Sequence, residues 1–433
     1  MTIKELVTKL AGTTYRRVFN QEMSPAEEDF VRSLSWVGVG SFIATALLAV
    51  FSILGGRLLG PQEYGKFTLI QSIAMFLCIP MLMSFDTAML KYSAEKNELA
   101  RQKSIVSTAY IIIAGLTVIS IALMLIFTQP LARVFATTPE LFRFSIYFAV
   151  LYAFFTLSQT TLRSVNRMRA FAFSQPMYAV ILLIAFALFL LLGGLTFRAM
   201  VYSGLIAFAI AALVIHFRYN RQYFSFNLDK AWARTLSRFA FATIIAGIAT
   251  VVYDNIGKIV ITHYMTVADV GIYGAYFTAT MSIASVLWGV FNIVFFPTAS
   301  RYSDKRPLLR RINRLVPLII VLGIPLIMGS GYLILLLYGG EYPFNILWLA
   351  LFATSAILYV IRFFYASLLT SEGPRGAFLS SIAGVATALV SLGLSILLVP
   401  IMGISGAMVA AIAGYLAGMV VLLWRGRQYL EAS

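Results

Sequence analysis

The sequence is poor in the residues that hold disulfides and metals. It contains one cysteine, Cys78, and two histidines, His216 and His263, in 433 residues. A single cysteine excludes an internal disulfide and a paired-cysteine metal site. Because neither histidine lies near an acidic cluster, we expect no zinc or di-metal centre and no bound cofactor.

Charged residues are also scarce, and long stretches of the sequence contain almost none, which indicates a membrane protein. They make up 12% of the chain, against about 25% in an average soluble domain, whereas hydrophobic residues make up 60%. The apolar runs reach about 20 residues, the length of a membrane-crossing helix, and lack the period-two alternation of a barrel strand. The sequence therefore predicts an all-α polytopic membrane protein surrounded by membrane lipid.

We expect twelve transmembrane helices, separated by loops that are short on one side of the membrane. These short loops leave no room for a soluble catalytic domain, so we do not expect an enzyme. The predicted spans are 33–57, 66–86, 104–128, 142–163, 171–193, 197–217, 239–264, 272–297, 313–338, 344–370, 376–399 and 404–424.

The distribution of basic residues predicts the orientation. Of the 33 Lys and Arg residues, 26 fall on the side of the N-terminus and 5 on the opposite side. The positive-inside rule then places both termini in the cytoplasm and the protein in the cytoplasmic (inner) membrane. Because the same asymmetry accounts for the net charge of +16, we expect no nucleic-acid partner.

Short motifs recur at an offset of 206 residues. Residues 59–67 match 265–273, and residues 166–169 match 372–375. With six spans in each half, the halves enter the membrane in the same direction and are related by an axis along the membrane normal. We therefore expect a two-lobed transporter with a cavity between the lobes. The matched pairs are Glu63 and Asp269, Gly65 and Gly271, Phe67 and Tyr273, and Arg169 and Arg375.

The repeat divides the chain into five parts. We expect a cytoplasmic amphipathic segment over 1–32, an N-lobe of six helices over 33–217, a basic cytoplasmic linker over 218–238, a C-lobe of six helices over 239–425 and a cytoplasmic tail over 426–433.

Three ionisable residues lie well inside the spans and are the first candidates for function. Asp254 and Lys258 are four residues apart, so on a helix they share a face and can pair. Arg362 offers a planar fork for phosphate, and Lys258 a compact charge. Ionisable groups at that depth cost at least about 2.5–3.5 kcal/mol each, so they normally have a partner or face a water-filled cavity. The aligned N-lobe residues are Leu48, Ser52 and Thr156, so we expect the C-lobe to carry the charged site.

Polar and aromatic neighbours extend this candidate site. Asn255 and Thr262 could supply oxygen ligands for a coupling Na⁺ beside Asp254, or Asp254 could carry a proton, and the sequence leaves both open. Asp86, at the end of the second span, is a candidate for gating or ion coupling, or an interfacial acid satisfied by nearby basic residues. Tyr253 and Tyr276 could stack on sugars, although tyrosines near span ends also form interfacial belts.

Two stretches carry a resemblance to a known family. Residues 56–67, of sequence GRLLGPQEYGKF, and Asp254-Asn255 followed by residues 269–273, DVGIY, resemble the polysaccharide-transport (O-antigen flippase, Wzx-like) family. This family belongs to the multidrug/oligosaccharidyl-lipid/polysaccharide (MOP) exporter superfamily, and the likeness runs over residues 33–425. It implies a MATE-like fold of twelve helices in two lobes. It also implies a flippase that moves undecaprenyl-pyrophosphate-linked oligosaccharide between leaflets by alternating access, in cell-surface polysaccharide biosynthesis.

Two other functions remain open at this point. A cation-coupled multidrug exporter of the same superfamily would favour an acidic, aromatic cavity, whereas this chain has two cations and one clear acid at depth. A polymerase or ligase of the same glycan pathway would need a sizeable outer loop. For a flippase, we expect a lipid-linked oligosaccharide as substrate and glycosyltransferases or a glycan polymerase as neighbours.

Overall fold

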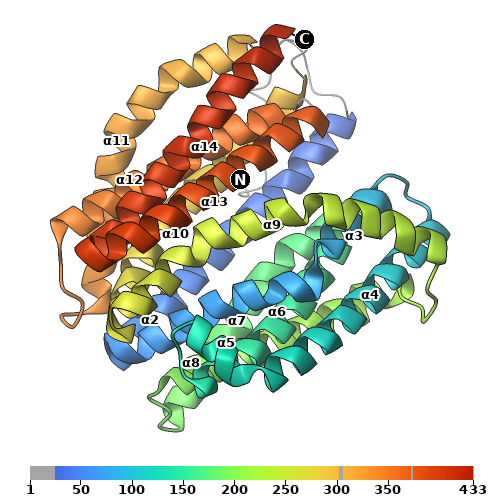
Figure 1. The fold of residues 1–433 in the computed structure, drawn as a ribbon. Coiled ribbons are helices and arrows are strands. Elements are labelled where there is room, and N and C mark those ends of the chain that lie inside the picture. Colours follow the sequence, from blue (N-terminus) through green and yellow to red (C-terminus); the bar gives the residue numbers. More distant parts are fainter. Residues whose placement is uncertain (1–24, 302–305, 372–373, 433) are drawn as a thin grey trace, which may run out of the picture.

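The computed structural model describes residues 25–301, 306–371 and 374–432, and these residues contain helices and connecting loops but no strand (Figure 1). The predicted amphipathic segment over 1–20 lies outside the described residues. The helices are α2 (Pro25–Leu82), α3 (Phe85–Ala94), α4 (Leu99–Ile126), α5 (Thr128–Val134), α6 (Pro139–Ser164), α7 (Met168–Leu191), α8 (Phe197–Ile215), α9 (Lys230–Tyr264), α10 (Val267–Arg301), α11 (Arg306–Tyr338), α12 (Ile346–Thr370), α13 (Pro374–Met402) and α14 (Ile404–Ala432).

Eleven helices in the described part of the chain are long and apolar enough to cross a membrane, and one of them accounts for two predicted spans. The apolar part of α2, Trp36–Leu82, has 47 residues. At about 1.5 Å per residue it is roughly 70 Å long, more than twice the hydrocarbon thickness of about 30 Å. Gly60 interrupts the helix with φ 74° and ψ 170°, followed by Pro61. The first two predicted spans therefore lie on either side of Gly60.

The helices form two lobes, as the sequence predicts. Figure 1 shows α3–α8 on one side and α10–α14 on the other, with α9 running along the boundary. Helix α9 packs against α13 and α14 of its own lobe and against α2, α3 and α4 of the other. Residues on α9 are thus placed where the two lobes meet.

The repeat offset of 206 holds along the fold. Helices α12, α13 and α14 begin within one residue of the positions that the offset assigns from α6, α7 and α8. The second part of α2 and α10 correspond in the same way, because Pro61 aligns with Val267, where α10 begins. The two lobes are therefore copies of one helical unit.

The lobes meet at a close crossing of α2 and α10 built on the two aligned glycines. A Cβ on Gly65 would lie 1.9 Å from the carbonyl oxygen of Val267, and a Cβ on Gly271 would lie 2.0 Å from that of Pro61. Val267 and Pro61 are themselves repeat mates, so the contact is reciprocal about the axis between the lobes. Only glycine fits at either position. We call this crossing the glycine seam.

Substitution at the glycine seam should weaken the fold. Gly271→Ala forces α10 away from α2, and we expect a cost of about 1–3 kcal/mol, as for other overpacked interiors. Thermal unfolding of the purified protein in detergent should show the lowered midpoint. Gly115→Ala on α4 is the matched control, because a Cβ there has no atom within 4 Å. An unchanged midpoint for Gly271→Ala would show that the two helices do not touch there.

Two boundaries differ from the expected ones for local reasons. The second span ends at Leu82 rather than 86, because Met83 and Ser84 adopt positive φ values of 42° and 60°. Most of the expected linker is helical, because a π-helical turn (His216–Asn220) and a 3₁₀ turn (Arg221–Tyr223) follow α8, and α9 begins at Lys230 with Asp229 as its cap. Hydrogen bonds from the backbone N–H of Trp232 and from the Ser104 hydroxyl lower the pKa of Asp229, which keeps the cap ionised.

Candidate functional site

Arg362 is a buried cation in the middle of the C-lobe. Its side chain is 4% exposed, and its guanidinium carbon lies 4.8 Å from the centre of the Tyr253 ring. Two glycines make room for it: a Cβ on Gly384 would lie 3.5 Å from Nη2, and one on Gly418 would lie 3.1 Å from Nε. Nε has no hydrogen-bond partner among the described residues. A buried guanidinium with an unused donor can accept an anionic ligand.

Asp254 and Lys258 lie on the same helix but do not form the direct ion pair that their spacing allows. Lys258 Nζ extends toward α10 and lies 5.0 Å from the centre of the Phe277 ring. The Asp254 side chain is exposed and interacts electrostatically with Arg362 and Lys258. The direct ion pairs in the described part of the chain are Lys66 with Glu63, Arg101 with Glu95, and Arg198 with Glu140. Both charges of α9 thus remain open to other ligands.

The polar neighbours on α9 hydrogen-bond to their own helix. Asn255 Nδ2 donates to the carbonyl of Val251 at 3.1 Å, and Thr262 Oγ1 donates to that of Lys258 at 2.8 Å. Asp86 belongs to α3, beyond the break at Leu82, and its electrostatic partner is Arg163 on α6. The charges of Asp86 and Asp254 both act on Tyr152 of α6, but Asp86 lies on a different helix from the other candidate residues. Among the described residues, no three acidic, cysteine or histidine side chains form a metal-binding group.

The two candidate tyrosines have different positions. Tyr253 is half-buried and lies between Arg362 and Tyr415, whose ring centre is 6.3 Å away. Tyr276 is 0% exposed. Its hydroxyl donates to the carbonyl of Pro343 at 2.8 Å and accepts from the Asn345 backbone N–H at 2.7 Å. Tyr276 therefore anchors the loop before α12, and its ring packs against Trp348 and Phe352 rather than lining the cavity described below.

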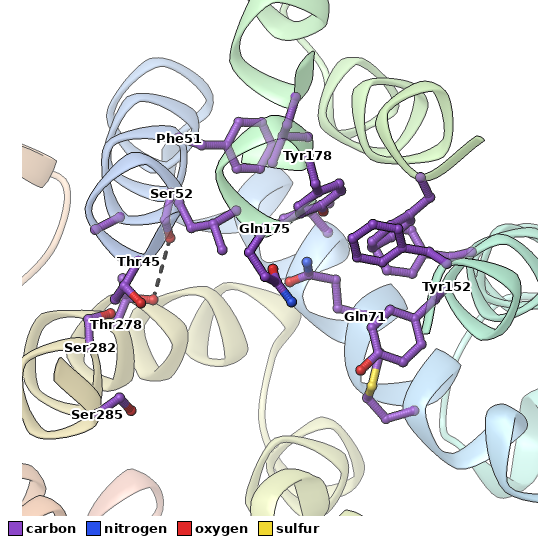
Figure 2. A pocket seen from close by; sticks show the side chains of 18 of the residues that line it. Thr45, Phe51, Ser52, Gln71, Tyr152, Gln175, Tyr178, Thr278, Ser282 and Ser285 are labelled. Carbon is purple, nitrogen blue, oxygen red and sulfur yellow. Dashed lines mark hydrogen bonds between the residues drawn. The ribbon is translucent and has the colours of Figure 1, made fainter. Parts of the chain in front are cut away.

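A cavity of about 520 Å³ lies between the N-lobe and α10 (Figure 2). Its walls come from α2, α6, α7 and α8 on one side and from α10 on the other. No Asp, Glu, Lys, Arg or His is among the described residues that line it. Its polar groups are instead amides and hydroxyls, including those of Gln71, Gln159, Gln175, Ser52, Thr45, Thr278, Ser282 and Ser285.

The cavity and the charged residues occupy equivalent places in the two lobes. At the repeat offset, Asp254, Lys258 and Arg362 align with Leu48, Ser52 and Thr156, and all three of these N-lobe residues line the cavity. An axis along the membrane normal keeps equivalent residues at the same depth. The charged side of the C-lobe and the neutral cavity of the N-lobe therefore lie at one depth on opposite sides of the axis.

Tyrosine and hydroxyl contacts between α2 and the C-lobe close one end of the cavity. Ser52 Oγ lies 3.0 Å from Tyr338 OH and 3.4 Å from Thr278 Oγ1, and it also hydrogen-bonds to Tyr64 OH. Nearby, Tyr342 OH donates to the carbonyl of Gly56 at 3.0 Å. This hydroxyl cluster, made of Ser52, Tyr64, Thr278 and Tyr338, holds the lobes together at the end of the molecule where α2 turns at Gly60.

The sequence alone did not reveal the cavity residues. Gln71, Gln159 and Gln175 come from three helices and have no common spacing. The repeat offset was the available signal, because it carries the three charged residues of the C-lobe onto positions in the cavity wall.

The described helices form a two-lobed, all-helical membrane fold, with buried charges in one lobe and a neutral cavity beside the other. Residues 30–303, more than half of the chain, match the model of the family described as "Polysaccharide biosynthesis protein". The chain belongs to this family. No curated protein matches the sequence.

Solved structures with the same fold cover nearly the whole chain at low identity. "Lipid II flippase MurJ, inward closed conformation" is similar with a TM-score of 0.65 and 14% identity, over 90% of this chain and 87% of that one. "Inward-facing conformation of a multidrug resistance MATE family transporter of the MOP superfamily" is similar with a TM-score of 0.62 and 12% identity, over 98% of each chain. "Crystal structure of MATE in complex with MaD5" is similar with a TM-score of 0.61 and 15% identity, over 93% of this chain and 97% of that one.

Proposed function

We infer that this protein is a flippase for polyprenyl-diphosphate-linked oligosaccharide in the synthesis of a cell-surface polysaccharide. One observation carries this proposal: the C-lobe holds two cations without direct ion pairs, Lys258 and Arg362, at positions that the repeat aligns with the wall of a neutral N-lobe cavity of amides and hydroxyls. A diphosphate needs cations, whereas sugars need neutral hydrogen-bonding groups. The family and the MurJ-like fold agree with such a substrate.

The two cations would act in sequence on the diphosphate. With the predicted orientation, α12 runs inward and α9 outward, so Arg362 lies in the inner half and Lys258 in the outer half of the membrane. The head group would enter from the cytoplasm and bind Arg362 after the Tyr253 ring moves aside. It would then pass to Lys258, while the polyprenyl tail stays in the lipid.

Release on the outer side would require the lobes to separate at the Gly60 end. The hydroxyl cluster and the glycine seam both lie there and hold that end closed. Asp254, exposed beside both cations, is the group that we assign to coupling by H⁺ or Na⁺. The site would work in the cytoplasmic membrane with both termini inside, beside the glycosyltransferases that make the substrate.

A multidrug exporter is the second candidate, because MATE transporters share the fold. A cationic drug would be drawn to an acidic cavity. The described lining of this cavity contains no carboxylate, and the cations of the C-lobe would repel such a drug. The electrostatics of the site therefore favour an anionic substrate.

Complementation of a deletion strain tests the proposal. The strain should accumulate polyprenyl-diphosphate-linked oligosaccharide on the inner leaflet and lose its surface polysaccharide. We expect Lys258→Ala to restore at most about a tenth of the surface polysaccharide, because a charge-assisted hydrogen bond contributes about 1.5–3 kcal/mol. Arg143→Ala, at an exposed residue on α6, should restore all of it. Normal surface polysaccharide in the deletion strain, together with greater sensitivity to cationic drugs, would favour the exporter.

A further inference from the structure

Resting on the proposed function, we propose that the N-lobe cavity is a saccharide subsite that takes the first sugars after the diphosphate, and that these sugars are uncharged. The head group is then divided between the lobes, with its phosphates on the C-lobe cations and its sugars in the N-lobe.

The polar groups in the cavity are suited to a neutral, hydroxyl-rich ligand. Figure 2 shows the amide ends of Gln71 and Gln175 converging in the open space. Gln71 has no hydrogen bond to another described residue, and neither do the hydroxyls of Thr45, Ser282 and Ser285. An amide offers both donors and acceptors, which matches a sugar hydroxyl in either role. A carboxylated or amino sugar would find no opposite charge among the described residues that line the cavity and would be costly to bury.

A chain of hydrogen bonds holds one of these amides in place. Gln175 Nε2 donates to Gln159 Oε1 at 3.2 Å, and Gln159 Nε2 donates to Ser174 Oγ at 2.7 Å. Ser174 Oγ in turn donates to the carbonyl of Phe171 at 2.6 Å. The chain orients Gln175 and leaves its side-chain oxygen for a ligand. The site is therefore preorganised, because the Gln175 amide is already held in place before a ligand binds.

Aromatic rings form the remaining wall of the cavity, whose volume is that of a ligand site. Tyr178 and Phe208 stack with their ring centres 4.5 Å apart, and Tyr152 and Phe155 lie beside them. Ring faces can pack against the C–H face of a sugar while amides bind its hydroxyls. The volume of about 520 Å³ falls within the range of roughly 300–1,000 Å³ for ligand cavities.

The position of Lys258 connects this subsite to the diphosphate. The Phe277 ring lines the cavity, and Lys258 Nζ lies 5.0 Å from its centre. In a lipid-linked oligosaccharide the first sugar is bonded directly to the diphosphate. A diphosphate on Lys258 would therefore place that sugar at the cavity, about one ring away.

Binding by the purified full-length protein in lipid nanodiscs tests this subsite with two probes. One is undecaprenyl diphosphate, and the other is the lipid-linked saccharide extracted from source cells that lack the gene. Mass spectrometry of retained lipid gives the affinities. We expect the saccharide-bearing probe to bind about tenfold more tightly. The double variant Gln71→Leu and Gln175→Leu should lose that gain and bind undecaprenyl diphosphate unchanged.

Two control variants separate the possible outcomes. Lys258→Ala should weaken the binding of both probes by the same factor. Gln102→Leu, at a buried glutamine on α4 outside the cavity, should leave both affinities unchanged. Three results would refute the saccharide subsite without refuting the flippase. The double variant could bind the saccharide-bearing probe with wild-type affinity, or it could lose equal affinity for both probes. The first sugar of the extracted lipid could also prove to be charged. Failure of both probes to bind the wild-type protein would refute the flippase itself.

Discussion

Arg362→Ala is expected to reduce transport of the lipid-linked oligosaccharide by about 10- to 100-fold, the factor that corresponds to a hydrogen bond to a charged group of about 1.5–3 kcal/mol. The guanidinium is buried beneath Tyr253 and has an unused donor at Nε, so the variant removes the first phosphate contact of the proposed pathway. The measurement is surface polysaccharide per molecule of protein in the membrane of the complemented deletion strain.

Two comparisons make this result specific. Arg362→Lys keeps the charge and loses the planar fork, so it should transport at an intermediate rate. Arg143→Ala removes an exposed arginine and should transport normally. If Arg362→Ala transports as well as the wild-type protein at equal abundance, Arg362 does not bind substrate.

A disulfide across the glycine seam should block transport in the oxidised protein by more than about tenfold and release it on reduction. An ideal Cβ on Gly274 lies 3.6 Å from the Cβ of Thr68, within the range of about 3.5–4.5 Å for disulfides. Thr68→Cys also removes the methyl group that crowds this position. The pair is made in a Cys78→Ala background, which removes the native thiol. The bond would prevent the lobes from separating at the Gly60 end.

The single variants Thr68→Cys and Gly274→Cys, treated with the same oxidant, are the controls and should transport as in reducing conditions. Electrophoresis after cleavage of the chain between the two positions reports how much disulfide has formed. Undiminished transport with the disulfide fully formed would show that α2 and α10 stay together throughout the cycle. The lobes would then have to open at a different place.

The fold was predictable because bilayer length and repetition leave clear patterns in a sequence. Twelve spans followed from apolar runs, and an offset of 206 followed from motifs that include Gly65 and Gly271. The structure explains why those glycines are in the motif, since each packs against the backbone of the other lobe. The break after Leu82 was not predictable, because Met83 and Ser84 adopt positive φ without a glycine to indicate it.

The candidate site was predictable only where a charge stood out against an apolar background. Lys258 and Arg362 were identified in this way, whereas neutral glutamines such as Gln71 and Gln175 do not stand out. Tyr276 was a candidate because a tyrosine ring can stack on a sugar, but its hydroxyl partners come from residues 343 and 345, a tertiary contact that the sequence does not show. The missing Asp254–Lys258 pair has a similar cause, since Lys258 extends to Phe277 on the next helix.

Translocation in proteoliposomes tests the central claim most directly. Lipid-linked oligosaccharide extracted from the deletion strain is placed in both leaflets, and a glycosidase that acts on its glycan is added outside. If the protein is a flippase, wild-type vesicles should lose the internal fraction to the glycosidase, and Arg362→Ala vesicles should keep it, as empty liposomes do. Retention of the internal fraction by wild-type vesicles, together with uptake or export of a cationic drug by the same vesicles, would contradict the account.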